Sequence, residues 1–228
     1  MTTIEDEDSG VARSSATLSE VAYGRILEIL FERRLPAGAF VSQNDLVKMT
    51  GVPVAPLRDA LRVLATDGIV TIHPRAGIEF IKPGLELTRA TYQFRGIIES
   101  SAVAIYAETA DDAEMLEIEQ RHLQAVEAVE TEGLTSVTRA ELEALEEVLH
   151  NAIIASLRNP LIDTSYRRIH NYLRILRLDR RITVPLALRS LREHLAIIQA
   201  CRHRNTAEAQ AALQTHFSNA MQRNMGLY

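Results

Sequence analysis

Residues 42–81 read SQNDLVKMTGVPVAPLRDALRVLATDGIVTIHPRAGIEFI. Apolar residues recur at helical spacing in the first part of this stretch, and two β-prone runs follow around a proline and a glycine. Ser42 is a candidate helix N-cap, and Gly51 permits the left-handed residue that a tight turn between two helices requires. The order of helix, turn, helix and hairpin predicts a winged helix-turn-helix.

The segments around this stretch complete the predicted N-terminal domain. Residues 18–34 have an amphipathic helical pattern, which Pro36 and Gly38 interrupt. Phe40-Val41 is expected to be a short extended piece. We expect the other elements to be helices at about 43–49 and 55–66 and β-strands at 69–72 and 78–81.

Lys82-Pro83-Gly84 is expected to interrupt regular secondary structure, and the sequence beyond it has a helical pattern throughout. The predicted helices are at about 88–109, 111–132, 136–157, 160–177, 185–203 and 206–225. The fold class is therefore mainly α: a winged helix-turn-helix followed by an all-helical bundle of six to seven helices. The predicted division is a disordered tail at 1–17, a first domain at 18–84 and a helical domain at 85–228.

Composition limits the classes of protein to consider. The 228 residues have a formal net charge of −5, so a nucleic-acid partner must be argued from local charge. Eight basic and seven acidic residues between positions 18 and 84 give that segment 8 − 7 = +1. Cys201 is the only cysteine, which excludes an intrachain disulfide and a multi-cysteine zinc site. Because we find neither a signal-peptide pattern nor an apolar run of about 18 residues, we expect a cytoplasmic protein with no membrane partner.

Three arginines suggest how the N-terminal domain meets DNA. Arg58 and Arg62 lie four positions apart and share one helix face, opposite the apolar face that contains Leu57. Arginine can bind guanine O6 and N7 in the major groove or grip a phosphate. Arg75 lies at the tip of the hairpin. The alternative is that these arginines are only the solvated face of the domain.

Histidines on three helices suggest a second site. Glu146 and His150 lie four positions apart beside an apolar stripe, and His194 and His216 each share a face with apolar residues. Imidazoles buried in a helical core need polar partners, and one metal ion would satisfy all three. The alternative is separate hydrogen bonds to carbonyl groups or water.

Residues 18–82 resemble the DNA-binding domain of GntR-type bacterial regulators. The resemblance implies that Arg58 contacts an operator. Asn44 and Val54 occupy positions where that family often has arginine, and we count them with Gly77 of the hairpin among the DNA-facing residues. The pieces that match are the L-x-x-G of Leu35–Gly38, the Gly51-Val52 turn, Pro56-Leu-Arg-Asp-Ala-Leu61 and Asp67-Gly68.

Residues 86–225 resemble the FadR-type sensor domain that is often attached to GntR-type regulators. The resemblance implies a divalent metal ion, with zinc expected and nickel or manganese as alternatives, and a small organic-acid effector that completes its coordination. Glu146 stands where the family usually has Asp. The implied ligands are Glu146, His150, His194 and His216, and the residues expected near the effector are Arg95, Glu99 and His122. The pieces that match are Arg95-x-x-Ile-Glu99, Ala144-x-Glu146-x-x-Leu149-His150 with Asn159, and Arg192-Glu-His194 with His216.

The expected function is thus regulation of transcription by a homodimer on inverted DNA half-sites, with repression more common than activation among relatives and no enzymatic activity. A rival is a di-iron bundle enzyme, because Glu119-x-x-His122 and Glu147-x-x-His150 are E-x-x-H pairs on successive helices. That site also requires two further glutamates, for which Glu99 and Glu193 are the candidates. The third alternative is a metal-independent interaction module.

Overall fold

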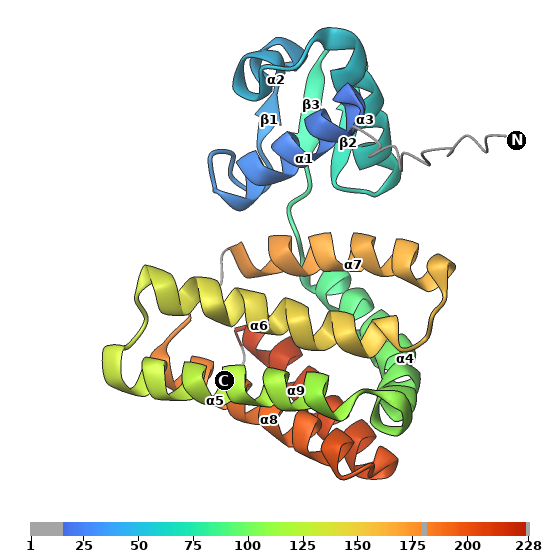
Figure 1. Ribbon diagram of the computed structural model, residues 1–228. Coiled ribbons are helices and arrows are strands. Elements are labelled where there is room, and N and C mark those ends of the chain that lie inside the picture. The colour runs from blue at the N-terminus through green and yellow to red at the C-terminus, as the bar shows by residue number, and fades with distance from the viewer. Residues whose placement is uncertain (1–15, 179–181, 227–228) are drawn as a thin grey trace, which may run out of the picture. The chain divides into compact units, whose positions relative to one another are not determined.

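The computed structural model describes residues 16–178 and 182–226, and the chain forms two compact units that divide between Ile81 and Lys82 (Figure 1). Residues 1–15 of the predicted tail lie outside the described residues. Thr17 at its end caps the first helix, because its side chain accepts a hydrogen bond from the Glu20 backbone N–H and Glu20 bonds back to Thr17. None of the helices in the described ranges is long and apolar enough to span a membrane.

The first unit is a winged helix-turn-helix, as predicted. The predicted strands shift by one residue toward the turn, and Phe40-Val41 is a third strand that pairs with β3 through Phe40 and Glu79. The sheet is antiparallel with the order β1-β3-β2. The elements are α1 (Leu18–Phe31), β1 (Phe40–Val41), α2 (Gln43–Thr50), α3 (Val54–Thr66), β2 (Val70–His73) and β3 (Gly77–Phe80).

Two local features fix the ends of these helices. Helix α1 ends three residues earlier than predicted, because Arg33 is left-handed with φ 60° and the following N–H of Arg34 bonds back to the Ile29 carbonyl. Helix α2 begins at the capping box of Ser42 and Asp45 and ends at Gly51, whose φ of 66° makes the turn into α3.

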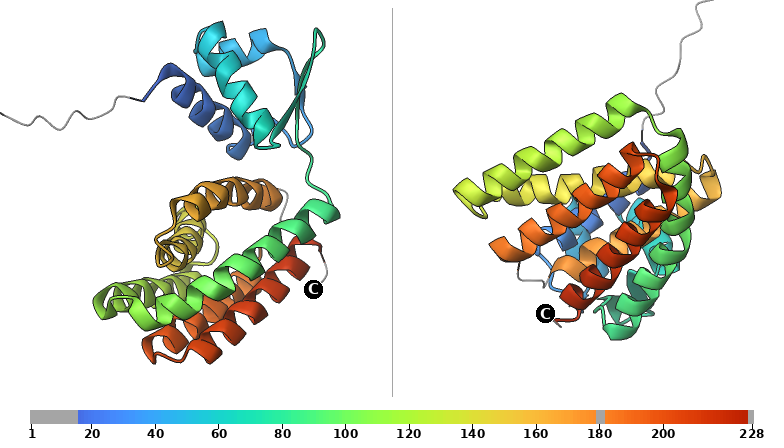
Figure 2. Two further views of the ribbon diagram at one scale, coloured as in Figure 1. Left: turned by 90° about the vertical axis from the view of Figure 1, so that its right-hand side faces the viewer. Right: turned by 90° about the horizontal axis from the view of Figure 1, so that it is seen from below.

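The second unit consists, in the described ranges, of six helices, which confirms the predicted fold class. Helix α4 packs along α9, α9 along α8, and α8 along α5 (Figures 1 and 2). Their buried side chains form the main apolar core, together with residues of α6 and α7. The bounds are α4 (Leu85–Thr109), α5 (Asp112–Glu132), α6 (Ser136–Ala155), α7 (Pro160–Leu178), α8 (Val184–Arg202) and α9 (Thr206–Asn224).

Candidate metal centre and nucleic-acid interface

Helix α3 presents a charged face to solvent. Its buried side is apolar and includes Leu57 and Leu61, whereas Arg58 and Arg62 are exposed on the other side. The Arg58 Nε donates a hydrogen bond of 3.1 Å to Gln43 Oε1 of α2, which leaves both of its Nη groups to reach outward. Arg62 pairs with Asp59 at 3.0 Å, with both side chains mostly exposed.

The wing and the helix starts contain the other predicted DNA-facing residues. Arg75 is exposed at the tip of the hairpin, where its φ of 64° is left-handed. Gly77 lies against β1, because an added Cβ would be 2.6 Å from Phe40 Cε1 and 2.8 Å from the Val41 carbonyl oxygen. Asn44 and Val54 are exposed at the N-terminal ends of α2 and α3.

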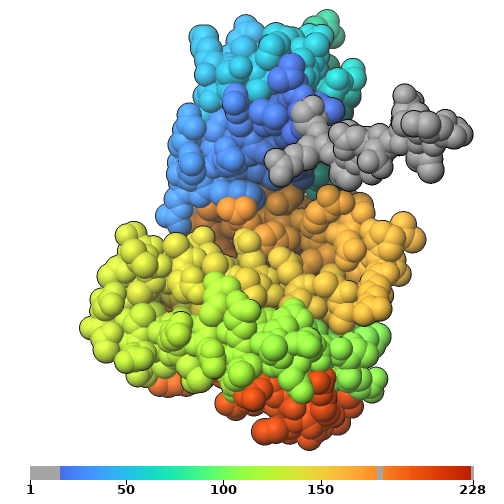
Figure 3. All heavy atoms as spheres, in the orientation of Figure 1, coloured from blue at the N-terminus to red at the C-terminus, as the bar shows by residue number. Residues whose placement is uncertain are grey.

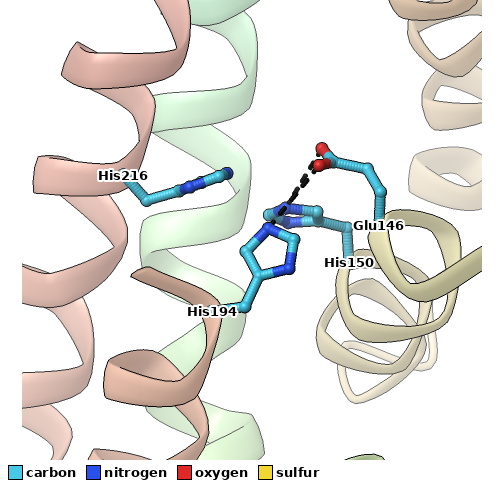
Figure 4. Close-up of side chains that lie close together, drawn as sticks. All are labelled: Glu146, His150, His194 and His216. Atoms are coloured by element: carbon cyan, nitrogen blue, oxygen red, sulfur yellow. Dashed lines mark ion pairs between the residues drawn. The ribbon is translucent and has the colours of Figure 1, made fainter. Parts of the chain in front are cut away.

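The structure brings Glu146, His150, His194 and His216 together, from α6, α8 and α9 (Figure 4). One potential ligand atom of each lies within 4.8 Å of the others. The three histidines are at most 2% exposed. Figure 3 shows the atoms of α5 and α6 on one outer face of this unit, whereas the three histidines are buried inside it.

Each of the three histidines uses Nδ1 for a hydrogen bond to a different partner. His150 Nδ1 lies 2.6 Å from Glu99 Oε2, and His216 Nδ1 lies 3.0 Å from Glu193 Oε2. His194 Nδ1 lies 3.1 Å from His122 Nε2. In contrast, none of the three Nε2 atoms has a hydrogen-bond partner among the described residues. Three such atoms that converge in one cluster are an arrangement that one bound metal ion would satisfy.

Glu146 places its carboxylate among these nitrogens. Its Oε1 lies 3.5 Å from His150 Nε2, and its Oε2 lies 3.5 Å from His194 Nε2. Arg177 of α7 also pairs with Oε1, and Arg95 Nη1 lies 3.6 Å from it. The carboxylate therefore faces two guanidinium groups and two imidazoles.

Arg95 is fully buried beside the cluster. Its Nε donates to Glu99 Oε1 at 2.5 Å, and its guanidinium lies 4.5 Å from the centre of the Phe217 ring. Its Nη1 and Nη2 have no hydrogen-bond partner within the part of the chain that the structure describes. Nη1 lies 3.6 Å from Glu146 Oε1, so both nitrogens face the cluster without a hydrogen bond of normal length.

Electrostatics favours a neutral-imidazole, ionised-carboxylate state. Burial lowers the pKa of His216 to about 4, and burial with the neighbouring His216 lowers the pKa of His194 well below its usual range. Burial raises the pKa of Glu146, but the positive charges around it, of which Arg177 is the largest cause, outweigh burial and hold that pKa well below its ordinary value. Near neutral pH His194 and His216 thus offer lone pairs, and Glu146 offers a negative charge.

The donor set fits a divalent metal ion. Neutral imidazole and carboxylate are ligands of zinc and neighbouring metals at about 2.0–2.2 Å, which places ligand atoms roughly 3–4.4 Å apart. The separations of 3.5 Å lie in that range, and the 4.8 Å limit requires only small side-chain adjustments. The Nδ1 partners are contacts of the kind that orient histidines in metal sites.

The two E-x-x-H pairs do not converge as a di-iron site requires. Glu119 pairs with Arg202, and Glu147 lies 3.3 Å from His170. Glu193, a candidate in that rival hypothesis, instead bonds His216, Asn219 and Arg223 on α9. The sequence did not predict this position of Glu193, nor the contacts of Arg177 with Glu146 and of the Tyr166 hydroxyl, which donates to Glu99.

Comparisons with known proteins agree with both units. The profile of bacterial regulatory proteins of the gntR family matches residues 18–80, and the profile of the FCD domain matches residues 90–219. The uncharacterized HTH-type transcriptional regulator YdhC from Bacillus subtilis (strain 168) is 21% identical over 197 residues, which are 86% of each chain.

Solved structures share the fold. E. coli McbR/YncC superimposes with a TM-score of 0.74 and 15% identity over 94% of this chain and 100% of that one. The metal-free FCD domain of the regulator TM0439 gives 0.51 and 22% identity over 64% of this chain and 99% of that one. At these identities the likeness shows the fold alone.

Proposed function

Because the chain belongs to the gntR family of bacterial regulatory proteins and has an FCD domain, we propose that its helical unit senses a small carboxylate through a bound metal ion. Proteins of this family are DNA-binding transcription regulators and are generally not enzymes. The observation that carries the proposal is the convergence of three unpartnered Nε2 atoms and the Glu146 carboxylate.

On the DNA side, we propose that α3 enters the major groove of the operator. Arg58 and Arg62 then face base edges or phosphates, and Arg75 reaches the backbone or the minor groove from the wing. Asn44 and Val54 lie at the helix ends nearest the groove. Gly77 supports this role indirectly, because it allows the wing to lie against β1.

For the metal, the proposed ligands are Glu146 Oε and the Nε2 atoms of His150, His194 and His216. Three imidazoles with one carboxylate suit zinc, and nickel and manganese are the alternatives. The ion supplies a positive charge to which an effector carboxylate can bind. Glu99 and Glu193 accept hydrogen bonds from His150 and His216, so each imidazole is held with its Nε2 toward the cluster.

For the effector, we propose a small organic acid next to the ion. Arg95 is the residue that contacts its carboxylate, because Nη1 and Nη2 are buried next to Glu146 and have no hydrogen-bond partner among the described residues. Glu99 fixes Arg95 through Nε, so the guanidinium is positioned before the effector binds. His122 contacts His194 and is therefore one residue further from the proposed metal ion than His194 is.

GntR regulators typically act as dimers, and we propose a homodimer in the cytoplasm that binds inverted half-sites. Effector binding shifts the equilibrium between two arrangements of the dimer that differ in DNA affinity. Such couplings are typically about 1–3 kcal/mol, or roughly 5–150-fold in affinity. Release from DNA with derepression is the direction we propose.

The test is a titration of DNA with and without acids. A DNA duplex is first selected from a random pool with the wild-type protein. The affinity of zinc-loaded wild type and of zinc-treated His216→Ala for this duplex is then measured in the presence of mono-, di- and hydroxycarboxylates. At least one acid should change the wild-type affinity about 5–150-fold and leave the variant unchanged. Equal responses of the two proteins would contradict a metal-dependent sensor.

A further inference from the structure

The three Nδ1 partners in the cluster differ in chemistry. Glu99 and Glu193 are carboxylates, whereas His194 bonds to His122, a fully buried histidine of α5. His122 also has a second contact, because its Nδ1 lies 2.7 Å from the Ile118 carbonyl oxygen. From the sequence, His122 was expected near the effector, but an effector contact would not account for its two hydrogen bonds.

These two contacts determine where the protons are. A carbonyl oxygen only accepts hydrogen bonds, so His122 Nδ1 carries a hydrogen and donates it to Ile118. A neutral imidazole has only one N–H, and a second proton would create a buried imidazolium whose hydrogen-bond partners are a carbonyl group and another imidazole, with no carboxylate among these partners to balance it. His122 Nε2 is therefore an acceptor, and His194 Nδ1 must be the donor. The remaining His194 nitrogen, Nε2, then has a lone pair and faces Glu146 at 3.5 Å.

We propose that His122 is a positioning residue for the metal ion, which fixes His194 as the tautomer that presents its Nε2 lone pair to the cluster. This inference rests on the proposed metal site. Without an acceptor at His122, the Nδ1 hydrogen of His194 would be buried without a partner, or the proton would move to Nε2 and block it as a ligand.

The choice of an imidazole as acceptor has a charge consequence. Each of the two carboxylates that bond an Nδ1 atom of the cluster is balanced by a buried arginine: Glu99 by Arg95, and Glu193 by Arg223. The hydrogen bonds of His122 go to a carbonyl group and an imidazole, so a carboxylate at this position would add a buried charge that no bonded cation balances. A neutral acceptor orients His194 without that cost.

The test compares zinc affinity in four full-length proteins: wild type, His122→Phe, His122→Leu and His122→Gln. Phe and Leu remove the acceptor and fill the space, whereas the Gln amide oxygen can accept from His194. Met115→Leu, a buried change on the same helix, controls for altered packing. Each protein is first stripped with a chelator, and its cooperative melting without metal shows that it is folded.

Competition with a chromophoric chelator then gives the zinc Kd, and Co²⁺ absorption reports the ligand geometry. We expect His122→Phe or His122→Leu, whichever folds, to raise the Kd about 10–100-fold and to alter the Co²⁺ spectrum. His122→Gln and Met115→Leu should stay within about threefold of wild type. A folded Phe or Leu variant within that range overturns the proposal, as does a Gln variant that loses as much affinity as the Phe variant.

Long-range ¹H–¹⁵N NMR of the metal-free protein gives an independent result. We expect the Nδ1–H tautomer for His194 in wild type, and an Nε2–H tautomer would overturn the proposal. Wild type that binds no zinc but has the Nδ1–H tautomer would refute the metal site and not the His122–His194 contact. Wild type that binds zinc together with an unaffected Phe variant would refute only the role of His122.

Discussion

At the scale of single residues, the helical unit divides the two nitrogens of each clustered histidine between separate tasks. Nδ1 forms a hydrogen bond with another side chain, and Nε2 lies in the cluster that the three histidines form with Glu146. This division depends on buried imidazoles being neutral, since a protonated ring would have no lone pair. Burial supplies that condition for His194 and His216 by lowering their pKa.

Arg58 tests the DNA interface at this scale. Arg58→Ala removes both outward-facing Nη groups and should weaken binding to the selected duplex by about 1–3 kcal/mol. Fluorescence anisotropy at fixed salt measures the change. Arg139→Ala, which removes an exposed arginine from α6, should leave the affinity nearly unchanged. If Arg58→Ala binds like wild type, Arg58 is not in the interface.

Cys201 gives a second residue-scale prediction. Burial raises the pKa of its thiol to about 12, and Arg204 only partly opposes the shift. Relative to the ordinary value of 9.0, the thiolate fraction at pH 8 falls roughly 1,000-fold. We expect a thiol-reactive dye to label the folded protein at least about 100-fold more slowly than the unfolded one. Comparable rates would mean that Cys201 is accessible.

At the scale of elements, a few specific contacts join neighbouring strands in the first unit and neighbouring helices in the second. In the first unit, the wing depends on the close approach of β1 and β3 at Gly77. In the second, Glu193 of α8 joins α9 through His216, Asn219 and Arg223. Each contact is local enough to be removed by one substitution.

A pair of glycines tests the wing. Gly77→Ala would place a methyl group against Phe40 and the Val41 carbonyl, and should destabilise the first unit by about 1–3 kcal/mol. Gly24 lies inside α1 with open space around it, so Gly24→Ala should stabilise the unit by about 0.5–1 kcal/mol. Denaturant unfolding measures both. Two changes of the same sign would contradict the predicted contact at Gly77.

A pair of glutamates tests the α8–α9 contact. Glu193→Gln leaves the buried Arg223 without its countercharge and should cost about 3 kcal/mol in unfolding free energy, even with chelator present. Glu130→Gln breaks an exposed pair with Arg192 and should cost less than about 1 kcal/mol. Equal losses would show that Glu193 does not stabilise the helix pair.

The sequence predicted most of the elements and left out their long-range contacts. Amphipathic periodicity, capping residues and glycine turns define most helix ends, so these are readable locally. The pairing of Phe40-Val41 with β3 was not predicted, because two residues show no periodicity. The Nδ1 partners lie 23, 51 and 72 positions away from their histidines, and spacing on one helix does not reveal them. The four proposed metal ligands lie together, but the ion itself stays a prediction.

At the scale of the whole molecule, the chain joins a winged helix-turn-helix to a helical unit that contains the cluster of Glu146, His150, His194 and His216. Arg95 and Arg177 face Glu146 from two helices, and Glu99 also pairs with Arg95, so the charges of these four side chains cancel. A bound metal ion would add two positive charges there and favour the binding of an organic acid. Everything that concerns regulation therefore depends on whether the ion binds.

Elemental analysis tests most directly whether the cluster binds a metal ion. Full-length wild type, His150→Ala and His216→Ala are stripped with chelator, reloaded with zinc, desalted and measured, with Arg58→Ala as a control outside the cluster. We expect about one zinc per chain in wild type and Arg58→Ala, and a large loss in both histidine variants. No zinc in folded wild type, or one zinc per chain in all four proteins, would contradict the proposed metal centre.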